Sequence, residues 1–345
     1  MRRCLSTFLP ALFFLALLVP RAFAADVTLK VHHFLSPKSA THRLMLEPWA
    51  RRVEARSGGR IKVEIYPSMT LGGKPPELIN QVRDGVVDIV WTLAGYTAGR
   101  FPRTEVFELP LVHRGDPVAT NLAIRDLFQS DLRAEYEGLH PLLVHVHQGQ
   151  AFHMVDRPIN RLEDLGGLKL RTPNRTGGWM IEALGAAPVG MPVPKVPLAL
   201  SKGVIDGALL PFEVTLPLKV HEIVKYHMEF AKGERLGTAV FLFVMNKARY
   251  DRLPLELQQV IDAESGPGFA REMGELWIKE EIRGRKAAIG HGNMISVIGG
   301  EELVKFRKAV SPVLERWITD VGARGIDGKA LIEKARKAIA AHSGK

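Results

Sequence analysis

Apolar and polar residues alternate along the chain in a pattern that switches repeatedly between strand and helix periods. Val27 to Val31 and Ile61 to Tyr66 alternate as strands with one buried face do. Between them, apolar residues recur at helical spacing from Met45 to Val53, and Pro48 predicts a kink or a restart of that helix. A strand, a helix and a strand in succession are typical of an α/β fold.

The same alternation continues through the rest of the chain. Pro75 and Pro76 open a helix, and the turn Asp84-Gly85 leads from it into a predicted strand from Val86 to Trp91. Further strands are predicted at Leu142 to Val146, at Leu168 to Arg171, after Asp206-Gly207 and at Thr238 to Asn246, and further helices at Trp179 to Leu184, Pro194 to Leu200, Glu301 to Asp320 and Ala330 to Ala341. Because the pattern restarts after a first α/β unit, it predicts two α/β lobes.

The N-terminal segment predicts export. A pair of arginines precedes an apolar run from Phe8 to Val19, which is followed by the small-residue site Ala22 to Ala24. The run is too short to span a bilayer, which takes about 20 residues. Residues 1–24 are therefore predicted to be a signal peptide, and the mature chain is expected in the periplasm. The single cysteine, Cys4, precedes the apolar run, so the mature chain has no thiol.

Charge argues against a nucleic-acid partner. The chain holds 47 basic and 37 acidic residues, but the two signs are interspersed, as from Lys279 to Lys286. A nucleic-acid-binding chain is expected to carry its basic residues in blocks or stripes. We interpret the basic balance as favouring solubility and a mild attraction for anions.

Catalytic motifs are missing from the sequence. We find no nucleophile elbow, no phosphate-binding loop, no dinucleotide-binding glycine motif and no zinc-binding helix motif. His145, His147 and His153 are the strongest candidates for metal ligands, because alternate residues of a strand share one face. No further ligand stands at suitable spacing, and half-buried strand histidines are the alternative interpretation. We expect a protein that is not an enzyme and that uses no metal or cofactor.

Several motifs between Asp156 and Pro217 occur in a fixed order. Leu162 to Asn174 is LEDLGGLKLRTPN, Leu184 to Met191 is LGAAPVGM, and Ala199 to Pro211 is ALSKGVIDGALLP. This series resembles the DctP-type substrate-binding subunits of tripartite ATP-independent periplasmic (TRAP) transporters. The resemblance extends over nearly the whole mature chain, through segments such as 66–73, 84–88, 107–110 and 253–261.

The resemblance implies a periplasmic binding protein with two α/β lobes, a hinge and a central ligand cleft. One lobe would hold residues 25–148 and 236–275, and the other 149–235 and 276–345. The ligand would be a small organic acid, which the protein would deliver, as a monomer, to the integral membrane subunits of a TRAP carrier. An enzyme on the same scaffold and a binding protein that serves a sensor are the alternative functions.

Arg171 is the leading candidate for ligand binding. It ends an apolar strand, and α/β folds place ligands at the carboxyl ends of strands. A guanidinium offers a planar fork that makes two charge-assisted hydrogen bonds to a carboxylate. In similar proteins the arginine at this place holds the substrate carboxylate. The alternative is an arginine that forms a salt bridge between the lobes.

Two departures from the family pattern bear on the ligand. Ala151 or a neighbour stands where sialic-acid-binding members carry a second arginine, and Leu210 stands where an asparagine is common. Because both changes remove polar groups, the sequence favours a monocarboxylate with an apolar or aromatic body over a dicarboxylate or a sugar acid.

The remaining candidate site residues are mostly aromatic. They are His33 and Phe34 after the first strand, Trp91 and Tyr96, Asn174 beside the arginine, and Leu210, Phe212 and Phe241. Each aromatic residue has core packing as its alternative role. Asn174 has the alternative of capping a helix that begins near Thr176.

Overall fold

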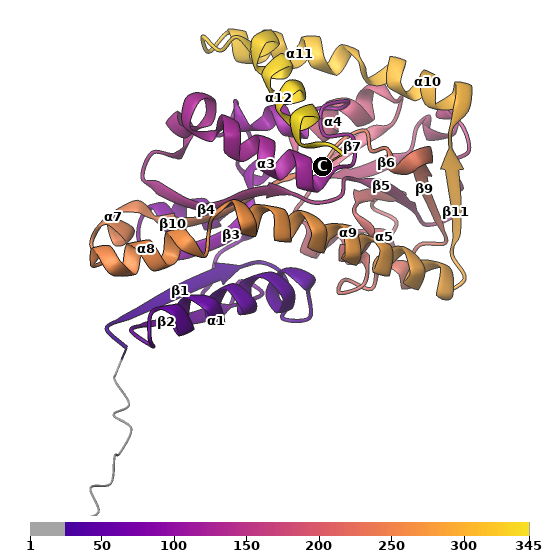
Figure 1. Cartoon of the computed structure of the whole chain (residues 1–345). Helices are drawn as coiled ribbons and strands as arrows, with labels where there is room; N and C mark the ends of the chain where they lie inside the picture. The colour runs from indigo at the N-terminus through magenta and orange to yellow at the C-terminus, as the bar shows by residue number, and fades with distance from the viewer. Residues whose placement is uncertain (1–24, 345) are drawn as a thin grey trace, which may run out of the picture.

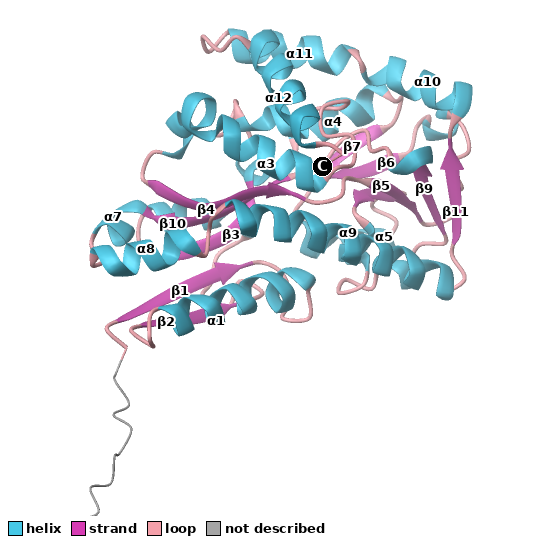
Figure 2. Cartoon of the chain, in the orientation of Figure 1, coloured by secondary structure: helices cyan, strands magenta, loops and turns pink. Residues whose placement is uncertain are grey.

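A computed structural model of the protein describes residues 25–344, so the predicted signal peptide at 1–24 lies outside the described residues. Two β-sheets lie side by side, and helices cover their faces (Figure 1). Strands and helices alternate along most of the chain, and the last third is mainly helical (Figure 2). The predicted α/β class with two lobes is confirmed.

The first sheet has five strands in the order β2-β1-β3-β10-β4. β1 is parallel to β2 and β3, whereas β10 is antiparallel to β3 and β4. The strands are β1 Val27–His33, β2 Ile61–Tyr66, β3 Ile89–Leu93, β4 Leu139–Val146 and β10 Val240–Asn246. β3 and β10 are buried along their whole length, as expected for central strands covered on both faces.

The second sheet has six strands in the order β11-β9-β5-β8-β6-β7. β6 is parallel to β7 and β8, and β9 is parallel to β11, whereas β5 is antiparallel to its two neighbours. The strands are β5 Ala151–Met154, β6 Lys169–Thr172, β7 Ala187–Gly190, β8 Gly207–Leu210, β9 Tyr226–Phe230 and β11 Met294–Ile298. The carboxyl ends of β6 and β8 therefore lie at one edge of this sheet.

The helices are α1 Glu47–Arg56, α2 Leu78–Arg83, α3 Pro117–Leu127, α4 Arg175–Ala183, α5 Val196–Ser201, α6 Phe212–Thr215, α7 Lys247–Asp251, α8 Leu255–Ala263, α9 Pro267–Gly290, α10 Gly300–Val310, α11 Pro312–Gly322 and α12 Gly328–His342. The long helix α9 runs along both sheets and contacts β4 and β11 (Figure 1). Gly284 lets α9 approach α6 closely, because a β-carbon there would lie 2.2 Å from the carbonyl oxygen of Phe212. Within residues 25–344, no helix is both long and apolar enough to cross a membrane.

Local sequence signals placed most of these elements well. Pro48 lies in the first turn of α1, directly after a π-helical turn, Thr41–Leu46, so the helix restarts there as predicted. The helix predicted from Glu301 to Asp320 is instead two helices, because Pro312 cannot donate the hydrogen bond that would continue α10. The C-terminal helix α12 packs against α3 beside the first sheet.

Candidate functional site

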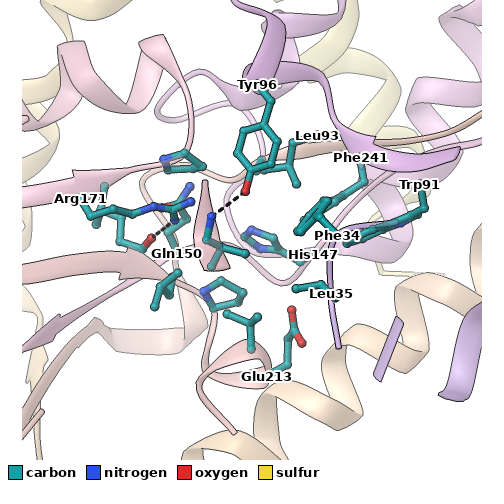
Figure 3. A pocket seen from close by; sticks show the side chains of 17 residues that line it. Phe34, Leu35, Trp91, Leu93, Tyr96, His147, Gln150, Arg171, Glu213 and Phe241 are labelled. Carbon is teal, nitrogen blue, oxygen red and sulfur yellow. Dashed lines mark hydrogen bonds between the residues drawn. The ribbon is translucent and has the colours of Figure 1, made fainter. Parts of the chain in front are cut away.

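A cavity lies between the two sheets. Residues of both sheets and of their loops line it. The first sheet and its loops contribute Phe34, Leu35, Trp91, Leu93, Tyr96, Ala239 and Phe241, and the second sheet and its loops contribute Arg171, Pro173, Val193, Leu209, Leu210, Pro211, Glu213 and Val214. The connection between β4 and β5 contributes His147 and Gln150. Figure 3 shows their side chains around one space. The predicted residues Arg171, Trp91, Tyr96, Leu210 and Phe241 are therefore brought together, and so is Phe34.

Arg171 lies in β6 with only 2% of its surface exposed. Its Nε donates to the carbonyl oxygen of Met191 and its Nη1 to that of Leu209, both at 3.0 Å. These bonds orient the guanidinium without neutralising it, and within residues 25–344 no carboxylate forms an ion pair with it. Burial lowers the pKa of Arg171 to about 10, which still leaves it positively charged at neutral pH. The cavity thus holds an oriented, uncompensated cation.

The salt bridge that was the alternative for Arg171 is formed by Arg175 instead. Arg175 begins α4, and its Nη2 lies 2.6 Å from a carboxylate oxygen of Glu105 and 2.8 Å from one of Asp320. Its guanidinium also covers the ring of Trp179, 4.9 Å from the ring centre. Arg175, four residues after Arg171, thus forms the ion pairs with Glu105 and Asp320. Arg171 forms none with these two acids.

Three further polar side chains face the cavity. The hydroxyl of Tyr96 accepts a hydrogen bond from the backbone N–H of Val193 at 2.9 Å, so its own proton is available for donation. Nδ1 of His147 accepts from the backbone N–H of Gly149 at 2.8 Å, and burial lowers the pKa of this imidazole far below its usual value. The neutral ring must therefore carry its proton on Nε2. The buried Oε1 of Gln150 has no hydrogen-bond partner within residues 25–344.

Aromatic rings form one wall of the cavity. Trp91 stacks on Phe34 at 5.1 Å and on Phe241 at 4.7 Å between ring centres. The indole N–H of Trp91 donates to Nε2 of His145 at 3.0 Å, which fixes the plane of the ring. A flat apolar surface that faces a cation fits a planar anion.

Glu213 also lines the cavity, and it is not among the site residues predicted from the sequence. It lies in α6 and is 8% exposed. Burial, together with the negative charges of Glu281 and Glu280, raises its pKa to about 8. The segment Ala208 to Val214 is apolar except for this one acid. An unpaired buried carboxyl destabilises a fold, so an acid in such a segment indicates a functional role, and this signal could have identified Glu213.

The raised pKa of Glu213 predicts how stability depends on pH. Between the ordinary value of 4.5 and about 8, the folded protein holds this proton more tightly than the unfolded chain does. Rising pH in this window therefore reduces the free energy of unfolding. Glu213→Gln removes the titration, so we expect its melting temperature to exceed that of the wild type by a few degrees at pH 8 and by less at pH 5.

Thermal unfolding at both pH values measures this difference. Glu222→Gln, at a glutamate whose side chain is 43% exposed, is the matched control and should show no such trend. An offset between Glu213→Gln and wild type that stays constant from pH 5 to pH 8 would contradict the assignment.

Three residues predicted for the site lie outside the cavity. His33 hydrogen-bonds His42 at 2.9 Å, and its successor Phe34 faces the cavity instead. Asn174 caps α4 by accepting from the N–H of Gly177 at 2.9 Å, which was its alternative role. Phe212 is fully buried against His153 and His227, because successive side chains of the short helix α6 diverge and Glu213 takes the cavity side.

The candidate metal-binding histidines have other partners. Both ring nitrogens of His145 face tryptophan N–H groups, at 3.0 Å for Trp91 and 3.1 Å for Trp277. His153 hydrogen-bonds His227 and the carbonyl oxygen of Leu210. In the described part of the chain, no three histidine, cysteine or acidic side chains are grouped as a metal site requires.

Comparison with known proteins decides the family. Residues 31–320 match the family description "Bacterial extracellular solute-binding protein, family 7", also called DctP. This chain belongs to that family. The resemblance to DctP-type subunits, stated on sequence motifs alone, is thereby confirmed.

Solved structures of this family are similar over nearly the whole chain. A TRAP solute-binding protein from a marine metagenome, described as specific for aromatic acid ligands and crystallised with 3-hydroxybenzoate, is 42% identical, with a TM-score of 0.90 over 93% of this chain and 100% of its own. One from Rhodoferax ferrireducens, with copurified benzoate, is 44% identical, with a TM-score of 0.89 over 92% and 98%.

A curated relative is more distant. The 2,3-diketo-L-gulonate-binding periplasmic protein of Escherichia coli is 27% identical over 82% of this chain and 83% of its own. The proteins similar to this chain therefore include one named for a sugar acid as well as two crystallised with aromatic acids.

Proposed function

We propose that this family 7 solute-binding protein captures an aromatic monocarboxylate in the periplasm and delivers it to the integral membrane subunits of a TRAP carrier. The observation that carries the proposal is the buried, uncompensated guanidinium of Arg171 beside the stacked rings of Phe34, Trp91 and Phe241. The two solved relatives at 42% and 44% identity, which hold 3-hydroxybenzoate and benzoate, support the same ligand class.

Each part of such a ligand has a matching group in the cavity. The carboxylate would lie on Arg171, where Nη2 remains for a charge-assisted hydrogen bond in addition to the bonds that orient the guanidinium. The O–H of Tyr96 and the Nε2–H of His147 would add neutral donors to the same anion. The ring would enter the slot beside Trp91, where burial of apolar area contributes about 25 cal/mol per Å².

Binding without catalysis is part of this proposal. The family consists of solute-binding proteins, and the polar groups of the cavity suit recognition of an anion. We further propose a monomer whose two lobes, 25–148 with 236–275 and 149–235 with 276–345, separate to admit the ligand. Arg171 is too deeply buried to be reached from outside without such opening. Small-angle scattering tests this part, because closure on a ligand should reduce the radius of gyration.

A thermal-shift screen against organic acids tests the proposed ligand class. A ligand at a hundred times its dissociation constant stabilises the folded protein by about 2.7 kcal/mol. We expect benzoate and its ring-substituted derivatives to raise the melting temperature, and succinate, glucuronate and sialic acid to leave it nearly unchanged at the same concentration. A screen in which only aliphatic dicarboxylates or sugar acids stabilise the protein would refute the proposal.

A further inference from the structure

Glu213 is a largely buried residue whose carboxyl group lines the cavity and has no side-chain hydrogen-bond partner in the part of the chain that the structure describes. It comes from α6, and Figure 3 shows it entering from a different side than Arg171, with the rings of Phe34, Trp91 and Phe241 on a third side. Within residues 25–344 its carboxyl oxygens accept no hydrogen bond, and only its backbone N–H is bonded, to Glu281 at 3.2 Å. These oxygens border the open space of the cavity, so they are free to bond a polar group that the ligand brings.

Among the described residues, no cation forms an ion pair with this carboxyl group. Arg171 does not contribute to the pKa of Glu213, and the nearby charges that do are Glu281 and Glu280 of α9. Arg235, the nearest buried arginine to Glu281, is engaged there at 3.3 Å and with Glu229 at 3.6 Å. Because burial and like charges both favour the neutral form, Glu213 is mostly protonated at pH 7 and can donate one hydrogen bond while accepting another.

A phenolic hydroxyl is the complementary group, because it also donates one hydrogen bond and accepts another. We propose that Glu213 binds a hydroxyl substituent on the ring of an aromatic acid whose carboxylate lies on Arg171, and that it makes the site selective for hydroxylated rings over unsubstituted ones. This inference rests on the proposed function and narrows its ligand class.

The position of the hydroxyl on the ring follows from the arrangement of the two groups. An ortho hydroxyl lies beside the carboxylate and therefore beside Arg171. Glu213 enters from another side, so a hydroxyl in the meta or para position points toward it (Figure 3). A second carboxylate at the same place would meet the negative field of Glu281 and Glu280 and would be disfavoured.

Titration calorimetry at pH 7 with benzoate, 3-hydroxybenzoate and 4-hydroxybenzoate tests the inference. For the wild type we expect at least one hydroxybenzoate to bind about tenfold more tightly than benzoate, the value of one or two net hydrogen bonds. Glu213→Met removes both carboxyl oxygens at nearly constant side-chain size. For this variant the ratio of the hydroxybenzoate affinity to the benzoate affinity should fall to about one. Glu213→Gln keeps a donor and an acceptor, so it should retain most of the ratio.

The matched control is Glu222→Met, the same substitution at an exposed glutamate outside the cavity, which should keep the wild-type ratio. Circular dichroism confirms that each variant is folded. A folded Glu213→Met variant that keeps the wild-type ratio overturns the inference, and so does a wild type that binds all three acids equally, although the proposed function would stand. A wild type that binds none of the three acids overturns both.

Discussion

Replacing Arg171 by alanine is expected to weaken the binding of benzoate by about a hundredfold or more. Hydrogen bonds to a charged group are worth about 1.5–3 kcal/mol each, and a carboxylate on this guanidinium would also lose its only counter-charge. Two backbone carbonyls hold the guanidinium in place before any ligand enters. Removal of Arg171 therefore removes a preorganised anion site rather than a mobile surface charge.

Arg171→Lys separates charge from geometry. An ammonium keeps the positive charge but cannot bond the carbonyls of Met191 and Leu209 and still present a planar fork, so we expect severe weakening in this variant too. Arg252→Ala, at an exposed arginine, is the control and should bind like the wild type. Calorimetry measures the affinities, and thermal unfolding of the free proteins shows that the variants are folded. If the alanine variant bound within about threefold of the wild type, Arg171 would not hold the carboxylate.

Selectivity against polar acids is the second large expected effect. We expect an aromatic monocarboxylate to bind at least about tenfold more tightly than hexuronates, sialic acid or four-carbon dicarboxylates. A ligand hydroxyl that finds no partner when it is buried costs roughly 1–3 kcal/mol. Leu210 lines the cavity with apolar surface, whereas Ala151, its register partner on β5, does not, so the expected selectivity rests on Leu210.

Leu210→Asn tests the origin of this selectivity. An asparagine supplies a donor and an acceptor in the apolar surface, so the gap between benzoate and glucuronate should narrow. Leu198→Asn makes the same change at a leucine that is 66% exposed and outside the cavity, and should leave the gap as it is. A competition experiment in which glucuronate or succinate displaces the aromatic acid at equal concentration would refute the prediction, without bearing on Arg171.

The sequence by itself determined the family and the fold class. Motifs from Leu162 to Pro211 were sufficient for the family, because a series of short motifs in a fixed order is specific even when each is weak. Local patterns also predicted β2 at its observed bounds and the restart of a helix at Pro48. The short strands β5, β7, β9 and β11 were not predicted, because four or five residues without clear alternation carry little periodic signal.

Only the tertiary structure decided which side chains share the cavity. Phe212 and Glu213 are adjacent in sequence, yet the aromatic residue is buried against His153 while the acid faces the cavity. Arg171 and Arg175 both follow from the same motif, but Arg175 lies within reach of Glu105, which is distant in sequence, and Arg171 does not. Such choices depend on contacts between segments far apart in the chain, and local propensity and periodicity contain no information about them.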